Sequence, residues 1–198
     1  ASRRRPRCLV RAWSSDVLFR STDRKILQGF PLFRQPDEIS CGPTCCSMVL
    51  NYYGVAAGFR SLQKKTKARL LKIGNIQVGF TLPSKVEKAL EAFGLSSTVY
   101  QAGCSGHIVQ MIDETRPPIL LVRSSQKTWH YLVAIGYDRS RSIKVADPAG
   151  RQYWLAWDVL EKAWRFDGDL RGNIFSSRRS GVDRVGHRID LWRTLVEA

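Results

Sequence analysis

The sequence has few acidic residues and no long apolar run. Its 17 aspartates and glutamates stand against 32 lysines and arginines, which leaves a formal net charge of +15 at pH 7. Such an excess suits an anionic partner, for example a nucleic acid, an anionic membrane surface or an acidic peptide. The longest apolar stretches, PPILLV and HYLVAIGY, have the length of strands, whereas a membrane-spanning helix needs about 18 apolar residues or more. We therefore expect no transmembrane segment in this sequence.

Histidine and cysteine are also scarce, and they do not form a metal-binding pattern. The chain has three histidines and five cysteines, without the CxxC pair and spaced histidines of a zinc site. We expect neither a metal nor another cofactor. A secreted chain would be expected to carry an even and dispersed set of cysteines. The odd number therefore favours a reducing compartment, either the cytoplasm or an organelle matrix.

Internal repeats and low-complexity linkers are absent as well, and 198 residues suffice for one well-buried core. We expect a basic N-terminal extension at 1–30, one domain at 31–165 and a basic C-terminal extension at 166–198. The opening ASRRRPRCLVR has the composition of an organellar targeting remnant, although a chain cut at this point would look the same. The two extensions are where a polyanion or a larger assembly would bind.

Helical patterns fill the first part of the domain, and strand patterns fill the second. Helices are expected from Cys41 to a stop at Gly54, at 60–72, at 81–93 with Thr81 as the cap, and from a cap at Ser105. The later runs PILLVRS, WHYLVAIGYD, SIKVADP and RQYWLAW are short, rich in β-forming residues and separated by turn residues. The order predicts an α+β fold in which N-terminal helices pack on a C-terminal antiparallel sheet.

Three cysteines fall within six positions in the stretch SCGPTCCSM. Cys41 lies at the expected start of a helix, where unpaired backbone N–H groups and the positive end of the helix dipole favour a thiolate. Cys45 and Cys46 follow four and five residues later, and we expect them to pack in the core. Taken alone, Cys41 can also be interpreted as a buried core thiol.

Cleavage of an amide by a thiolate also needs a histidine that moves the proton. His130 precedes the best strand pattern and Asp147 ends the next run, so a hairpin between them would bring the carboxylate beside the imidazole. Gln35 lies six residues before Cys41, and its side-chain N–H and the backbone N–H of Cys41 can together hold an oxyanion. Asp138 competes for the role of the orienting carboxylate, but its place in the hairpin turn puts it far from His130.

The order of Gln35, SCGPTCCSMVLNYYG, His130 before an aliphatic strand and Asp147 in ADP resembles the papain-like cysteine peptidases. The resemblance is to those related to bacteriocin-leader (double-glycine) processing peptidases. It covers most of the chain and includes GFTLPSKVEKALEAFGL. It implies a papain-like fold with Cys41 as the nucleophile and His130 as the base and then the acid. It further implies that Asp147 orients His130 and that Gln35 completes the oxyanion hole.

The resemblance implies a cysteine peptidase that acts on a peptide or protein substrate through an acyl-enzyme on Cys41. Cysteine acyltransferases use the same groups and differ only in the second nucleophile, so hydrolysis and transfer both stay open. A third interpretation, favoured by the net charge and the basic extensions, is a catalytically retired peptidase fold that serves as a structural subunit of a larger assembly. The chain departs from the family at Ser40, where many members carry Asp before the nucleophile.

Overall fold

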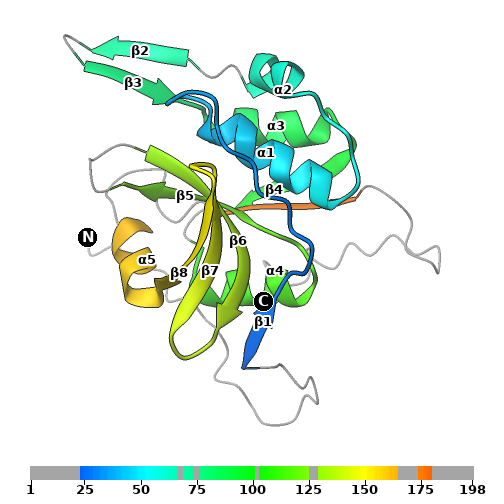
Figure 1. The fold of residues 1–198 in the computed structure, drawn as a ribbon, viewed down its shortest axis with the longest axis vertical. Coiled ribbons are helices and arrows are strands. Elements are labelled where there is room, and N and C mark those ends of the chain that lie inside the picture. The colour runs from blue at the N-terminus through cyan, green and yellow to red at the C-terminus, as the bar shows by residue number, and fades with distance from the viewer. Residues whose placement is uncertain are drawn as a thin grey trace, which may run out of the picture.

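The computed structural model describes residues 23–66, 69–73, 76–100, 103–124, 129–164 and 174–179. Most of both basic extensions expected from the sequence therefore lies outside the described residues. Within these ranges, a large antiparallel sheet has helices packed on both of its faces (Figure 1). This arrangement confirms the α+β fold class.

The sheet has seven strands, and all neighbouring strands in it are antiparallel. Six of them follow the order β4 (Leu95–Tyr100), β9 (Ile174–Arg179), β5 (Ile119–Arg123), β6 (Trp129–Asp138), β7 (Ser142–Asp147) and β8 (Arg151–Ala156). The seventh strand, β1 (Arg24–Ile26), pairs with the end of β6. Strands β1 and β9 lie outside the range 31–165, so the sheet contains residues from both sides of the expected domain.

Two hydrophobic cores lie on opposite faces of this sheet. One core contains α1 (Cys41–Tyr52), α2 (Phe59–Thr66) and α3 (Pro83–Glu91), and the other contains α4 (Ser105–Asp113) and α5 (Trp157–Trp164). Residues of β5 alternate between the two, because Ile119 and Leu121 face the first core and Leu120 and Val122 face the second. The sheet is thus the middle layer of three.

The second helix is shorter than the sequence suggested. Instead of covering 60–72, α2 ends at Thr66, and β2 (Arg69–Ile73) follows and pairs with β3 (Ile76–Phe80). The two strands form a separate hairpin beside α2 and α3 (Figure 1). The spacing of Lys and Leu in this region fits a helix, but Gly74–Asn75 between two β-rich runs is a hairpin signal, and it is the correct one.

Two expected helix caps are also wrong by one position. The N-cap of α3 is Leu82, with Pro83 in the first turn, so Thr81 does not cap this helix. The Thr81 carbonyl instead accepts a hydrogen bond from the Tyr131 hydroxyl at 2.8 Å, which ties the start of α3 to β6. Ser105 is the first residue of α4 and not its cap.

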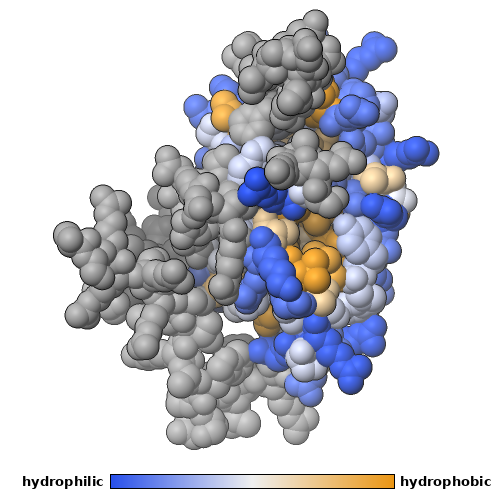
Figure 2. All heavy atoms as spheres, turned by 90° about the vertical axis from the view of Figure 1, so that its left-hand side faces the viewer, coloured by the Kyte–Doolittle hydropathy of each residue, from blue (hydrophilic) through white to orange (hydrophobic). Residues whose placement is uncertain are grey.

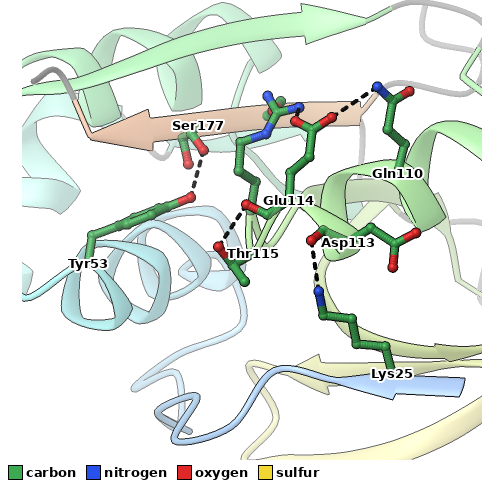
Figure 3. A network of polar contacts seen from close by, with 9 residues as sticks. Lys25, Tyr53, Gln110, Asp113, Glu114, Thr115 and Ser177 are labelled. Atoms are coloured by element: carbon green, nitrogen blue, oxygen red, sulfur yellow. Dashed lines mark hydrogen bonds and ion pairs between the residues drawn. The ribbon is translucent and has the colours of Figure 1, made fainter. Parts of the chain in front are cut away.

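Polar contacts attach β9 to the helices around it (Figure 3). The Tyr53 hydroxyl, just after α1, donates to the Ser177 carbonyl at 2.8 Å. Arg116 follows α4, and its Nη1 donates to the Ser176 hydroxyl at 3.0 Å, while the same guanidinium pairs with Glu114. These contacts connect segments that are 60 and 124 residues apart in the chain. They hold β9 in place between β4 and β5.

Candidate active site

Cys41 is the first residue of α1, and a tight turn positions it there. Ser40 occupies the N-cap position, but its hydroxyl donates to Asp37 Oδ1 at 2.6 Å and makes no capping bond to the helix. The backbone N–H of Ile39 donates to the same oxygen at 3.0 Å. The Asp37 carboxylate therefore organises the turn that leads into Cys41.

The three cysteines of α1 differ in exposure. Cys41 keeps 8% of its surface exposed, whereas Cys45 and Cys46 are fully buried. Burial raises the pKa of Cys45 well above its ordinary value and raises the pKa of Cys46 to about 12. Because a thiol reacts as the thiolate, Cys45 and Cys46 are unreactive packing residues, as expected, and Cys41 is the accessible thiol of the three.

His130 and Asp147 meet through the hairpin of β6 and β7. His130 is the second residue of β6, Asp147 is the last residue of β7, and His130 Nε2 lies 3.0 Å from Asp147 Oδ1. The hairpin contains a register shift between Ala134 and Gly136. Because Nε2 faces Asp147, Nδ1 is the imidazole nitrogen that is left for another partner, and the Cys41 side chain is also hydrogen-bonded to this imidazole.

The Cys41 thiol and the Asp147 carboxylate both act on the protonation of His130. Burial lowers the pKa of His130, but hydrogen bonding to Asp147 and Cys41 and the charges of these two groups outweigh burial and raise it to about 9. The imidazole is therefore protonated at neutral pH. A protonated imidazole beside a thiol at a helix N-terminus is the environment that stabilises a thiolate.

Asp147 is ionised although it is only 3% exposed. Burial raises its pKa, but hydrogen bonds from His130 and from the backbone N–H of Ala149, together with the positive charges of His130 and Arg151, lower the pKa overall. The Ala149 N–H lies 2.8 Å from Oδ1, the oxygen that also faces His130. The turn after β7 thus helps to fix the carboxylate.

Gln35 is placed beside this turn, but its side chain points into its own loop. The Gln35 backbone N–H donates to the Pro148 carbonyl at 2.7 Å, next to Asp147. Its side-chain Nε2 donates to the Asp37 carbonyl at 2.7 Å. A side-chain amide has two N–H groups, so one of them remains for a further acceptor. The structure brings Cys41, His130 and Asp147 together and holds Gln35 at the edge of the same site.

A sequence profile of the Peptidase_C39-like family matches residues 27–170. The chain belongs to the Peptidase_C39-like family.

In this C39-like chain, Asp138 was the alternative to Asp147 as the carboxylate that orients His130. Asp138 instead accepts hydrogen bonds from the backbone N–H and the hydroxyl of Ser140 in the β6–β7 turn.

Solved structures share the fold of this C39-like chain. The peptidase domain of Streptococcus ComA, a bifunctional ABC transporter involved in quorum sensing, is 19% identical with a TM-score of 0.60, covering 76% of this chain and 98% of that chain. A C39-like peptidase from Bacillus anthracis is 15% identical with a TM-score of 0.63, covering 79% and 98%. A double-glycine motif protease from an AMS/PCAT transporter, solved with a leader peptide, is 16% identical with a TM-score of 0.52, covering 78% and 92%. No curated protein matches the chain.

Sequence reasoning missed two residues of the C39-like site. Asp37 was overlooked, although an Asp two residues before a backbone N–H is the pattern of an Asx turn. Tyr153 was overlooked because its contact with Asp147 depends on the register of β7 and β8. Within the described ranges, no group of three His, Cys, Asp or Glu side chains is placed to hold a metal ion. No helix in those ranges is long and apolar enough to cross a bilayer.

Proposed function

We propose that this C39-like protein is a cysteine peptidase that cleaves peptide bonds through an acyl-enzyme on Cys41. The observation that carries the proposal is that Asp147 and Cys41 both act on the imidazole of His130, while Cys41 starts a helix. In the first step the Cys41 sulfur attacks the substrate carbonyl carbon, and protonated His130 gives its proton to the leaving amine. In the second step His130 takes a proton from a water molecule, whose oxygen attacks the carbonyl carbon of the thioester. The C–S bond to Cys41 then breaks, which releases the carboxylic acid product and restores the Cys41 sulfur. Asp147 keeps the imidazole oriented throughout.

The oxyanion that forms in both steps needs hydrogen-bond donors. The backbone N–H of Cys41 at the start of α1 is one candidate, and the second side-chain N–H of Gln35 is the other. The anchoring of Gln35 to the Pro148 carbonyl supports this role, because it ties the donor to the same turn that fixes Asp147.

The substrate of the proposed reaction is a peptide. One of the related structures is a double-glycine motif protease bound to a leader peptide, so a peptide with a double-glycine site is the first substrate to test here. Two exposed apolar side chains are Phe33, two residues before Gln35, and Leu82, which follows Thr81, the residue whose side chain lies against Gly42 of α1. Figure 2 shows one face of the molecule, on which apolar side chains gather among hydrophilic ones.

Alkylation by iodoacetamide tests the nucleophile without a known substrate. We expect iodoacetamide to alkylate Cys41 at neutral pH at least about tenfold faster in the wild type than in His130→Ala, because the imidazole of His130 acts on the thiol and a helix starts at Cys41. Peptide mapping by mass spectrometry identifies the modified residue, and Cys46→Ala is the matched control that leaves the rate unchanged.

The proposal fails if Cys41 behaves as an ordinary thiol and Cys41→Ala leaves peptide cleavage unchanged. In His130→Ala the alkylation rate of Cys41 at neutral pH should fall to that of an ordinary thiol. The described free thiols are those of Cys41, Cys45 and Cys46, since Cys104 is disulfide-bonded. Product masses in 18O-labelled water, with and without an added amine, distinguish hydrolysis from acyl transfer.

A further inference from the structure

The second oxygen of the Asp147 carboxylate has partners that the proposed reaction does not use. Oδ1 faces His130 and the N–H of Ala149, whereas Oδ2 accepts a hydrogen bond from the Tyr153 hydroxyl at 3.3 Å. Arg151 Nε lies 3.5 Å from the same Oδ2. Because the Asp147 side chain is only 4% exposed, a carboxylate oxygen without such donors would be costly.

The register of β7 and β8 produces this arrangement. Asp147 pairs with Arg151, and Val145 pairs with Tyr153, so Tyr153 is the diagonal cross-strand neighbour of Asp147. Diagonal neighbours are within reach of aromatic side chains. The turn between the strands closes with a hydrogen bond of 2.9 Å from the Gly150 N–H to the Asp147 carbonyl. The contact therefore depends on the hairpin backbone and not on a flexible loop.

Tyr153 and Arg151 differ in how firmly they can hold the carboxylate. The Arg151 side chain is 71% exposed, so its ion pair with Asp147 is weakened by water and salt. Its guanidinium lies over the Tyr153 ring, 5.5 Å from the centroid. Tyr153 is partly buried, and burial together with the charge of Asp147 raises its pKa to about 12, so its hydroxyl keeps its proton and donates. Tyr153 is therefore the partly buried partner of Asp147 Oδ2, and Arg151 is its exposed partner.

We propose that Tyr153 is a positioning residue that holds Asp147 Oδ2, so that Oδ1 stays aimed at His130 Nε2. The inference rests on the proposed function, since it assigns Tyr153 to the orientation of the same catalytic groups. Without the hydroxyl, the carboxylate keeps only the exposed Arg151 at Oδ2 and can rotate away from His130. The thiolate of Cys41 then loses part of the support that it receives from the imidazole.

A double-mutant cycle between Tyr153→Phe and Asp147→Asn tests this role. The readout is the alkylation rate of Cys41 by iodoacetamide at pH 6, together with the kcat of peptide cleavage. We expect Tyr153→Phe to lower the rate by about three- to tenfold, the range of one typical hydrogen bond, because this contact is long at 3.3 Å. In the Asp147→Asn background the same substitution should change nothing, because its effect passes through the carboxylate. If Tyr153 acted only through packing, Tyr153→Phe would lower the rate by the same factor in the wild-type and the Asp147→Asn backgrounds.

Two further variants act as controls for the cycle. Tyr137→Phe removes a hydroxyl that donates to the Asp113 carboxylate at 2.6 Å, in a contact that does not involve the candidate site, and it should leave the rate unchanged. Arg151→Gln should lower the rate by less than about twofold because its ion pair is exposed. Circular dichroism melting curves show whether each variant is folded at the assay temperature.

The outcomes separate this inference from the proposed function. If Asp147→Asn lowers the rate but Tyr153→Phe does not, or if Tyr153→Phe costs the same in both backgrounds, the positioning role is overturned and the peptidase proposal stands. If Asp147→Asn itself leaves the rate unchanged, the proposed role of Asp147 is wrong, and the role of Tyr153 is overturned with it.

Discussion

Replacing Asp147 by Asn should lower the pKa of His130, because it removes one of the two groups whose hydrogen bonds and charges raise that pKa. His130 Nε2 lies 3.0 Å from Asp147 Oδ1, and the Cys41 side chain also raises the pKa of this imidazole. Arg151 and Tyr153 act on Asp147 from its other oxygen. Asn keeps the size of Asp but removes the negative charge, while the burial that lowers the pKa of His130 remains. We therefore expect His130 to titrate near pH 9 in the wild type and at least one pH unit lower in Asp147→Asn.

The size of the effect on stability follows from the same pKa. A pKa of about 9 in place of 6.5 corresponds to about 3 kcal/mol, at 1.36 kcal/mol for each pH unit. Since the native His130 binds its proton more tightly than the unfolded one, this stabilisation is complete below pH 6.5 and is lost as the pH rises to 9. The stabilisation that comes from the Asp147 carboxyl group has the opposite pH dependence. Its lowered pKa stabilises the fold above about pH 4, and this contribution is lost in more acidic solution.

Histidine NMR titration and urea unfolding measure the two quantities. In the same spectrum His107 is an internal control, because burial lowers its pKa below 6.5 and it lies on α4. Its titration should not change in Asp147→Asn. The free energy of unfolding of the wild type should fall by at least about 1 kcal/mol more than that of the variant between pH 6.5 and pH 9, because the pKa of His130 is at least one unit lower in the variant. Titration of wild-type His130 near pH 6.5, or equal pH dependence in both proteins, would refute the reasoning.

Two further substitutions probe the fold and the oxyanion site. Gly136→Ala should lower the free energy of unfolding by about 1–3 kcal/mol, because its Cβ would lie 2.7 Å from the Lys25 carbonyl oxygen of β1. Gly58→Ala, where no atom lies within 4 Å, is the matched control, and equal urea midpoints for both variants would contradict the close packing of β1. Gln35→Ala should lower the kcat of peptide cleavage by about 10²- to 10³-fold while the alkylation rate of Cys41 changes by less than about twofold. A parallel loss in both assays would mean that Gln35 acts on the nucleophile instead.

The residues of the candidate site were accessible to sequence reasoning because each lies at the end of a well-marked element. Cys41 follows a turn and starts a helix that ends before Gly54, and this helix has the expected bounds. The YDRSRS turn between two β-rich runs predicts the hairpin of β6 and β7. These local signals suffice to place a nucleophile, a histidine and a carboxylate on neighbouring elements.

The register within the sheet was not accessible in this way. The run WHYLVAIGYD is apolar on both faces, so a period of two does not show which residues face which core. The shift between Ala134 and Gly136 changes the alternation, and Tyr137 joins the same core as Ala134. For the same reason the sequence could not predict that Tyr153 reaches Asp147. Strand β1 has only three residues, and the places of β1 and β9 depend on contacts with distant segments.

The burial of Asp147 bears on the choice between a peptidase and a retired structural fold. A carboxylate that is only 3% exposed loses most of its hydration, and well-packed apolar residues often serve stability as well as a buried ion pair does. The free energy that we calculate from the pKa of His130 is only the difference between the charged and the neutral imidazole. It does not include the free-energy cost of burying the Asp147 carboxylate. A purely structural subunit has no physical need for an ionised Asp147, a protonated His130 and the least buried thiol of α1 in one place. A peptidase requires all three, so the electrostatics of the site favour catalysis.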